Sequence, residues 1–290
     1  MVLTGSSGVD RVAVVTDSTA CLPAELVASL GIRVVPLHVV VSGTSLEEGT
    51  EISPAEVAEA LRDHRVVSTS KPTPEAFSRE YRAAATAGAE AVVSIHLSGA
   101  LSGTADSALV AAEDSPIPVV VVDSMTMGLG LGFGVLDAVR LSRAGATPKE
   151  IALTVRRRAA ASRVLFYVDT LEYLRRGGRI GSAAALLGSA LSVKPLLHLV
   201  AGRVEPLERI RTRSRALARL ADLAVDFAGS RAVDVGVQHL DNPEAAADLV
   251  RTLRDRIPVI NQLMQSEVGA VIGAHVGPGM LATVVAPSQD

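Results

Sequence analysis

Hydroxyl side chains gather at four places along the chain, each directly after a short Val-rich segment. They occupy residues 16–19, 68–70, 98–104 and 124–126. Where parallel strands end, ligands bind beside helix N-termini, which present free N–H groups and a partial positive charge. Neutral hydroxyl donors at such an edge suit a carboxylate or a phosphate. The alternative, that each Ser or Thr only caps a helix, is weakened because four clusters would share one edge of the sheet.

The segment from Ser98 to Thr104 is the most specific of these clusters. Ser98, Ser102 and Thr104 surround two glycines, and glycine lets a ligand approach the backbone closely. The segment lacks the Gly-Lys-Ser/Thr ending of a Walker A loop. It also differs from a nucleophile elbow, since the residue two positions before Ser98 is His96 rather than glycine. We interpret the segment from Ser98 to Thr104 as a loop that binds an anion.

Three histidines, His96, His239 and His275, each end a segment that we predict to be a strand. No pair has the spacing of metal ligands, and the single cysteine, Cys21, adds no further ligand. We therefore expect no metal site and no cofactor. A structural role is the default for each histidine, and His275, beside Gly277-Pro278-Gly279, is the best functional candidate.

Arginines supply the cationic candidates. Arg175, Arg176 and Arg179 flank a Gly-Gly pair, a pattern typical of a solvated basic loop or of a contact with an anion or a partner protein. Four arginines alternate between positions 209 and 215 and would share one face of a strand, either on the surface or at the edge of a cleft. The run 156–158 is predicted to be a plain helix surface.

The composition limits the class of protein. The 290 residues are 48% hydrophobic, which allows a sizeable core, and the net charge is -3 with no Trp. Neither value favours nucleic-acid binding. The N-terminus lacks the basic start and apolar run of a signal peptide, and no apolar stretch reaches the roughly 18 residues of a membrane helix. With one cysteine, the chain fits a reducing compartment, so we expect a soluble cytoplasmic protein.

The elements that would position these residues change along the chain. In the first half, strand-like segments alternate with predicted helices, such as the one that Ser53 and Pro54 open, as expected for a parallel sheet between helices. The second half combines a predicted hairpin over 196–213 with helices and a strand over 268–275. Alternating glycines from 128 to 134 indicate close helix packing.

We therefore predict an α/β fold with two domains. Residues 10–160 form the N-terminal domain, a mainly parallel sheet with flanking helices and hydroxyl-rich strand ends. Residues 161–286 form a smaller α+β domain.

Short motifs occur in a fixed order along the chain, from about Val12 to Val285. They are Thr16-Asp17-Ser18-Thr19, Ser68-Thr69-Ser70-Lys71-Pro72, Leu101-Ser102-Gly103-Thr104, Asp123-Ser124, Leu171-Glu172-Tyr173-Leu174 with Gly177-Gly178-Arg179-Ile180, Lys194-Pro195, and His275-Val276-Gly277-Pro278-Gly279. Each motif is weak alone, but their order and spacing are specific, and together they resemble the motifs of the DegV family.

The resemblance implies that one long-chain, palmitate-like fatty acid binds between the two domains. Thr69 matches the family threonine that holds the fatty-acid carboxylate, and Ser98 matches a serine that also contacts it. Where the family usually has a second serine, this chain has Gly99, so that donor is lost or replaced by backbone. His275 matches a histidine near the carboxylate, and Arg211 an arginine near the head group or the partner surface.

The resemblance also implies a protein partner. Some family members are the acyl-carrying subunit of bacterial fatty acid kinase, in which a separate ATP-binding subunit phosphorylates the held carboxylate. Arg175, Arg176 and Arg179 match the basic loop of the family, a contact with the partner or with phosphate. Because the chain shows no motif for ATP or Mg²⁺, we expect a lipid-binding protein rather than an enzyme.

Two other functions stay open. The first is a stand-alone acyl hydrolase in which Ser98 is the nucleophile, His275 or His96 is the base, and Asp123 or Asp17 orients the base. The second is a sensor that binds a small phosphorylated ligand at the same strand ends. Tight binding of a phosphate ester without lipid affinity would favour the sensor over the carrier.

Overall fold

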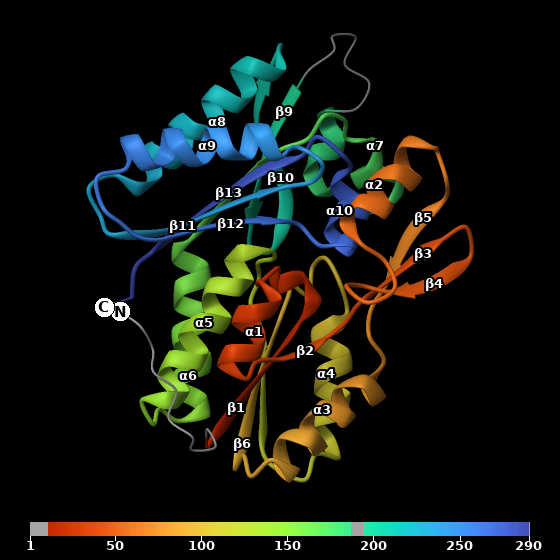
Figure 1. Cartoon of the computed structure of the whole chain (residues 1–290), viewed down its shortest axis with the longest axis vertical. Coiled ribbons are helices and arrows are strands. Elements are labelled where there is room, and N and C mark those ends of the chain that lie inside the picture. Colours follow the sequence, from red (N-terminus) through yellow and green to blue (C-terminus); the bar gives the residue numbers. More distant parts are fainter. Residues whose placement is uncertain (1–10, 187–193, 290) are drawn as a thin grey trace.

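The structure is a computed structural model that describes residues 11–186 and 194–289. It has a lower and an upper part, each built around its own sheet, with two long helices between the sheets (Figure 1). This α/β arrangement confirms the predicted fold class. The predicted boundary between residues 160 and 161 falls at the end of the helix that precedes the upper sheet.

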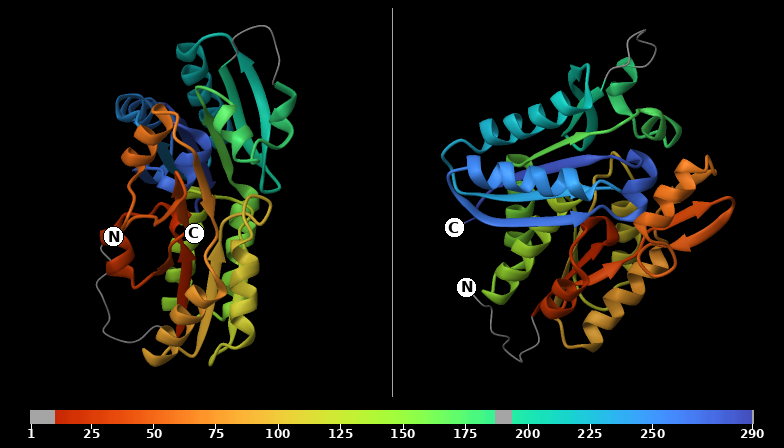
Figure 2. Two further views of the ribbon diagram at one scale, coloured as in Figure 1. Left: turned by 90° about the vertical axis from the view of Figure 1, so that its right-hand side faces the viewer. Right: turned by 45° about the horizontal axis from the view of Figure 1, so that its top comes forward.

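The lower part contains the predicted parallel sheet, with strand order β2-β1-β6-β7. Helices α3 and α4 cover one face, and α1, α5 and α6 lie on the other (Figures 1 and 2). The elements are β1 (Val12–Asp17), η1 (Ser18–Ala20), α1 (Ala24–Leu30), β2 (Arg33–Val35), α3 (Pro74–Thr86), β6 (Ala91–His96), α4 (Thr104–Glu113), β7 (Val119–Asp123), α5 (Leu129–Arg143) and α6 (Pro148–Ala161).

A small antiparallel sheet extends from the side of the lower part and reaches toward the upper one (Figure 1). It consists of β3 (His38–Val41), β4 (Thr44–Glu47) and β5 (Val67–Ser70), with α2 (Pro54–Arg62). As predicted, Ser53 caps α2, and its side chain and that of Glu56 form a reciprocal capping box. The hydroxyl cluster at 68–70 therefore ends an antiparallel strand and does not belong to the parallel sheet.

The upper part is a six-stranded mixed sheet with strand order β10-β9-β8-β13-β11-β12. Helices α8 and α9 cover its outer face, while α5 and α6 pack against its inner face (Figures 1 and 2). The elements are β8 (Arg163–Tyr167), α7 (Glu172–Arg176), η2 (Gly181–Leu186), β9 (Lys194–Val200), β10 (Arg203–Ile210), α8 (Arg213–Ala228), β11 (Val233–His239), α9 (Pro243–Arg256), β12 (Ile260–Glu267), α10 (Ala270–Val276) and β13 (Leu281–Pro287).

Two predictions for the upper part need correction. The segment 268–275 was expected to be a strand, but it forms helix α10, because a short buried apolar run fits either structure and its periodicity does not decide. The alternation of arginines from 209 to 215 does not lie on one strand face. Strand β10 ends at Ile210 and α8 begins at Arg213, so the four arginines are divided among a strand, a turn and a helix.

The glycines of α5 allow the close packing that the sequence indicated. A Cβ atom at Gly132 would lie 2.7 Å from the carbonyl oxygen of Ala20, and one at Gly130 would lie 2.4 Å from Thr126 Oγ1. Helix α5 therefore approaches the backbone beyond β1 more closely than any side chain would permit. From this position it contacts both sheets and joins the two parts of the molecule.

Arg158 is a further correction, since it was predicted to lie on a helix surface. Its side chain is buried and forms ion pairs with Asp137 of α5, at 2.6 Å, and with Asp234 of β11. In α6, Arg158 shares the inward face with Ile151 and Val155, at helical spacing. The guanidinium thus links both long helices to the upper sheet.

Candidate functional site

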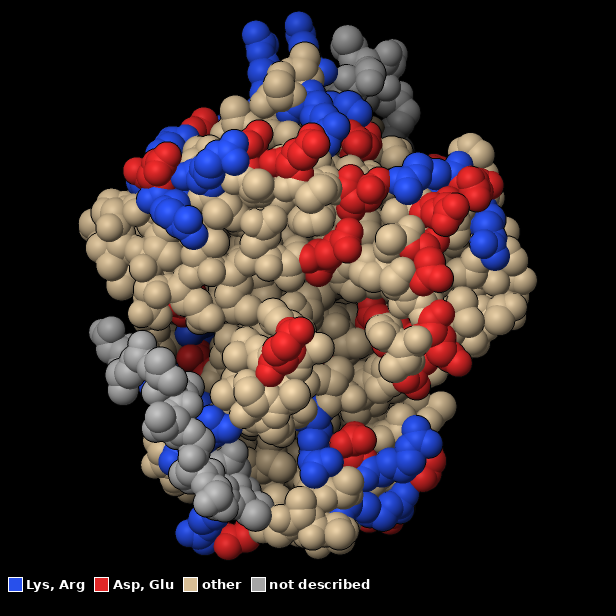
Figure 3. All heavy atoms as spheres, in the orientation of Figure 1, with Lys and Arg blue, Asp and Glu red and all other residues tan. Residues whose placement is uncertain are grey.

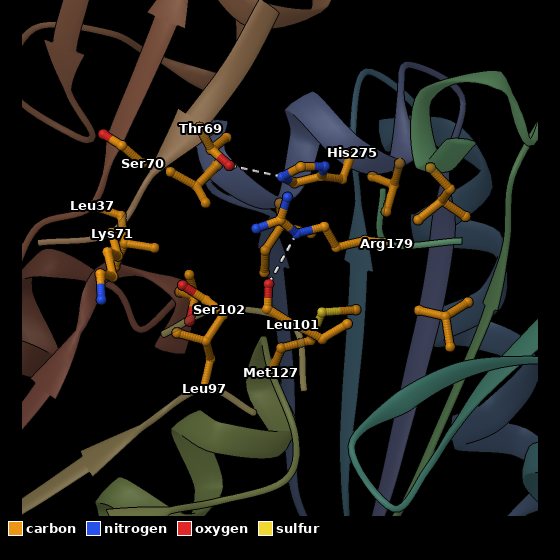
Figure 4. Close-up of a pocket in the computed structure, with 16 residues that line it drawn as sticks. Leu37, Thr69, Ser70, Lys71, Leu97, Leu101, Ser102, Met127, Arg179 and His275 are labelled. Atoms are coloured by element: carbon orange, nitrogen blue, oxygen red, sulfur yellow. Dashed lines mark hydrogen bonds between the residues drawn. The ribbon is translucent and has the colours of Figure 1, made fainter. Parts of the chain in front are cut away.

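A pocket of about 570 Å³, including the part open to solvent, lies between the lower part, the small sheet and the upper part (Figure 4). Most of its wall is aliphatic. These residues are Leu37, Leu97, Leu101, Met127, Leu174, Val204, Val271, Ile272 and Val276. The polar lining residues are Thr19, Thr69, Ser70, Lys71, Ser102, Arg179 and His275. None of these 16 described residues is Asp or Glu, so the pocket favours an apolar ligand with an anionic group.

Segments far apart in the sequence meet at the polar end of this pocket. Thr69 comes from β5, and its Oγ1 lies 2.8 Å from Nε2 of His275, 206 positions later, in α10. Figure 4 shows the two side chains pointing toward each other beside Arg179. The predicted pair Thr69 and His275 is thus brought together, although His275 reaches it from a helix and not from a strand end.

His275 is neutral near pH 7. Burial, and after it the positive charge of Arg179, lower the pKa of its imidazole to about 4. A neutral ring carries one N–H group. If Nε2 carries it and donates to Thr69 Oγ1, the Thr69 hydroxyl can donate its own proton to a ligand carboxylate. In that tautomer His275 fixes the direction in which Thr69 donates.

Arg179 supplies a permanent positive charge to the same end of the pocket. Its Nε donates to the Leu101 carbonyl at 2.9 Å, and its Nη1 donates to the Gly177 carbonyl at 2.6 Å. Two backbone acceptors therefore hold the guanidinium in place before any ligand arrives. Arg175 and Arg176 do not line the pocket; both are exposed and pair with Glu172.

Ser98 and Gly99 lie close by but do not line the pocket. The Ser98 hydroxyl donates to the Gly202 carbonyl at 2.8 Å and accepts the Ala100 N–H at 3.2 Å. The Gly99 N–H donates to Asp123 Oδ2 at 3.1 Å. A Cβ atom at Gly99 would lie 2.7 Å from that same oxygen, so a serine there would displace Asp123. In this structure both residues fix the loop after β6.

Arg211 lies outside the pocket as well. It is exposed in the turn between β10 and α8. Figure 3 shows Lys and Arg side chains standing out at the upper end of the molecule, above α8 and β9. The exposure of Arg211 makes it a surface residue.

The residues of the hydrolase hypothesis are not assembled around Ser98. Neither histidine contacts it: His96 bonds Asp17 Oδ2 through Nδ1 and Ser94 Oγ through Nε2, and His275 bonds Thr69. The chain Asp17–His96–Ser94 resembles a catalytic triad in its order of contacts. All three side chains are buried with no exposed surface, so a substrate cannot reach Ser94.

Several lining residues lay outside the sequence-based predictions of the site. Lys71 was named only as part of the motif from Ser68 to Pro72, yet it lines the pocket (Figure 4). Thr19 had only the general signal of its hydroxyl cluster, and its hydroxyl donates to Asp17. The aliphatic wall, such as Leu174 and Ile272, carried no signal, because any buried leucine or isoleucine has the same pattern.

The described ranges contain no candidate metal site and no helix that could span a membrane. No group of three or more His, Cys, Asp or Glu among residues 11–186 and 194–289 could hold a metal ion. In the same ranges, none of the helices combines the length and apolar character needed to cross a membrane.

Comparison with known proteins identifies the family to which the chain belongs. The family model described as "Uncharacterised protein, DegV family" matches residues 11–288. A DegV domain-containing protein of Streptomyces coelicolor is 54% identical over 275 residues, which cover 95% of this chain and 98% of the relative.

Solved structures show the same fold. One, described as fatty acid binding of a DegV family protein from Thermus thermophilus, is 38% identical with a TM-score of 0.90, and covers 96% of this chain and 100% of that one. Another, described as DegV, a fatty acid binding protein from Bacillus subtilis, is 35% identical with a TM-score of 0.87, and covers 96% and 99%. The chain therefore belongs to the DegV family.

Proposed function

We propose that this protein binds a long-chain fatty acid in the pocket, with the carboxylate at Thr69, His275 and Arg179. The observation that carries the proposal is the pocket itself, which joins an aliphatic wall to hydroxyl, imidazole and guanidinium groups and has no acidic residue among its described lining. The proposal is supported by two relatives, 38% and 35% identical, that are described as binding fatty acids.

The energetics of such a ligand fit these surroundings. Burying each CH₂ group contributes about 0.8 kcal/mol, so a C16 tail supplies most of the affinity. The head then needs only a few well-placed donors. Because Thr69 donates through one hydroxyl, a carboxylate bound there keeps a second oxygen available for chemistry or for a partner.

The finer part of the proposal concerns a partner. We infer that the protein presents its fatty acid in the cytoplasm to a separate ATP-dependent kinase subunit, which would form the acyl phosphate in lipid metabolism. On this view the chain is at most the subunit that does not bind ATP. Arg175 and Arg176 support a docking role, because both are exposed, and Arg179 in the same short segment lines the pocket. Their positive charges suit a phosphate or an acidic partner surface.

Replacing Thr69 by valine tests the carboxylate position. Valine keeps the shape of the side chain but removes the hydroxyl, so the affinity for palmitate should fall by about 1–3 kcal/mol. Isothermal titration calorimetry would measure the loss. Thr44→Val is a matched control, because Thr44 is exposed on β4 of the same small sheet. Unchanged palmitate affinity in Thr69→Val would contradict the proposed site.

A further inference from the structure

Glu48 lies behind the pocket wall and joins parts of the chain that are distant in sequence. It follows β4, and its side chain is 7% exposed. Oε1 accepts the N–H of Val271 at 2.7 Å, across 223 positions of sequence. A Cβ atom at Gly269 would lie 2.2 Å from the same oxygen, so this carboxylate occupies the space where another residue at 269 would place its side chain.

Both ends of this contact lead to the pocket. Val271 begins the stretch of α10 that presents Val271, Ile272, His275 and Val276 to the ligand space. On the other side, the Glu48 N–H donates to the Leu37 carbonyl at 2.9 Å, and Leu37 also lines the pocket. Glu48 is therefore hydrogen bonded to two residues that line the pocket, Leu37 and Val271.

A third contact adds η1 to this arrangement. The Ser18 hydroxyl accepts the Leu37 N–H at 3.0 Å, and it lies near enough to the Glu48 carboxyl group to lower the pKa of that group. Ser18 directly precedes Thr19, another lining residue. Glu48 thus lies beside η1, bonds the residue before β3 through its backbone N–H, and bonds the first turn of α10 through its carboxyl group.

Burial is unfavourable for the charged form of the Glu48 carboxyl group. Burial raises its pKa, the nearby carboxylate of Asp17 acts in the same direction, and the bonds from Ser18 and Val271 oppose the shift. Its other oxygen, Oε2, is buried and has no hydrogen-bond partner among the described residues. A buried carboxylate oxygen without a hydrogen-bond partner is unfavourable. The remaining contacts of Glu48 must therefore stabilise the local structure enough to offset this cost.

We propose that Glu48 is a positioning residue that ties α10 to the lower part of the molecule and so holds His275 against Thr69. Val271 and His275 are about one helical turn apart, so a movement of the first turn of α10 is transmitted to the imidazole. The 2.8 Å contact between His275 and Thr69 tolerates little displacement. The inference rests on the proposed function only where binding of a fatty acid is the measured quantity.

The test compares Glu48→Ala with Glu47→Ala, which removes the neighbouring carboxylate at the end of β4 and leaves the Val271 contact intact. NMR titration of the His275 ring gives a result that does not depend on any ligand. In Glu48→Ala no side-chain oxygen remains to accept the Val271 N–H, so the imidazole should become more exposed and its pKa should rise from about 4 toward the ordinary value for histidine. Palmitate affinity should fall about tenfold, and Glu47→Ala should leave both values unchanged.

Unchanged His275 titration and unchanged palmitate affinity in a folded Glu48→Ala protein would overturn the proposal. If that variant does not fold, Glu48→Asp is the second variant to test. Aspartate keeps the charge but is one methylene too short to reach Val271, so the same rise in the pKa of His275 is expected. If the unaltered protein binds no palmitate, the proposed function fails, while the His275 titration still decides the role of Glu48.

Discussion

Replacing Gly177 by alanine is expected to weaken palmitate binding about 100-fold, equivalent to about 2.7 kcal/mol. A Cβ atom at this position would lie 2.0 Å from His275 Nδ1 and 2.6 Å from Cε1. The backbone at Gly177 has φ −75°, which alanine adopts without strain, so the effect arises from the contact with the ring. The imidazole would have to move, and its bond with Thr69 would break.

The neighbouring glycine provides the control. Gly178 has φ +71° and open space where a Cβ atom would lie, so alanine there strains the backbone but leaves His275 in place. Gly178→Ala should therefore lower the stability by about 1–2 kcal/mol and affect palmitate affinity little. Calorimetric binding and denaturant unfolding of both variants would separate the two effects.

A double-mutant cycle tests whether Gly177 acts on palmitate binding through His275. In a His275→Ala background the ring is absent, so Gly177→Ala should cost almost no further affinity. If the two substitutions instead weaken binding additively, Gly177 does not act through His275, and the account of the head-group end would be wrong.

Replacing Arg158 by alanine is expected to lower the free energy of unfolding by about 3–5 kcal/mol. The substitution removes the ion pair of the buried Asp234 and leaves the buried Asp137 with only its longer ion pair to Arg140, at 3.7 Å. It also removes the guanidinium that lies 5.4 Å from the centroid of the Phe133 ring. Urea unfolding followed by circular dichroism would measure the change.

Arg157 is the matched control for this prediction. It is adjacent in α6 but exposed, so Arg157→Ala should change the stability by less than about 0.5 kcal/mol. Equal losses in the two variants would show that the buried ion pairs do not stabilise the junction between the long helices and the upper sheet.

Local signals in the sequence were sufficient for much of the fold. Helix α2 begins where Ser53 and Pro54 indicate, α1 ends at Leu30 before Gly31 in a left-handed conformation, and the hairpin of β9 and β10 turns at Ala201 and Gly202. Each of these features is determined by side chains within a few residues. Helix α10 could not be predicted in this way, because its apolar run is buried from several directions and shows no amphipathic period.

The site residues also differ in whether local signals in the sequence could identify their contacts. Thr69 and His275 could be named because they lie in family-like motifs, and the structure brings them within 2.8 Å. Ser98 lies in an equally specific motif, but its hydroxyl is bonded to Gly202 of a hairpin more than 100 residues later. Arg158 was misjudged because its acidic partners come from α5 and β11. Long-range contacts of this kind leave no local pattern.

The central claim, that the pocket holds a fatty acid, is tested most directly by denaturing mass spectrometry of lipid extracted from the protein purified from a bacterial host. The account predicts about one C16 to C18 fatty acid per chain in the unaltered protein, and less in Thr69→Val and Gly177→Ala. An extract without fatty acid, together with no uptake of added palmitate, would contradict it.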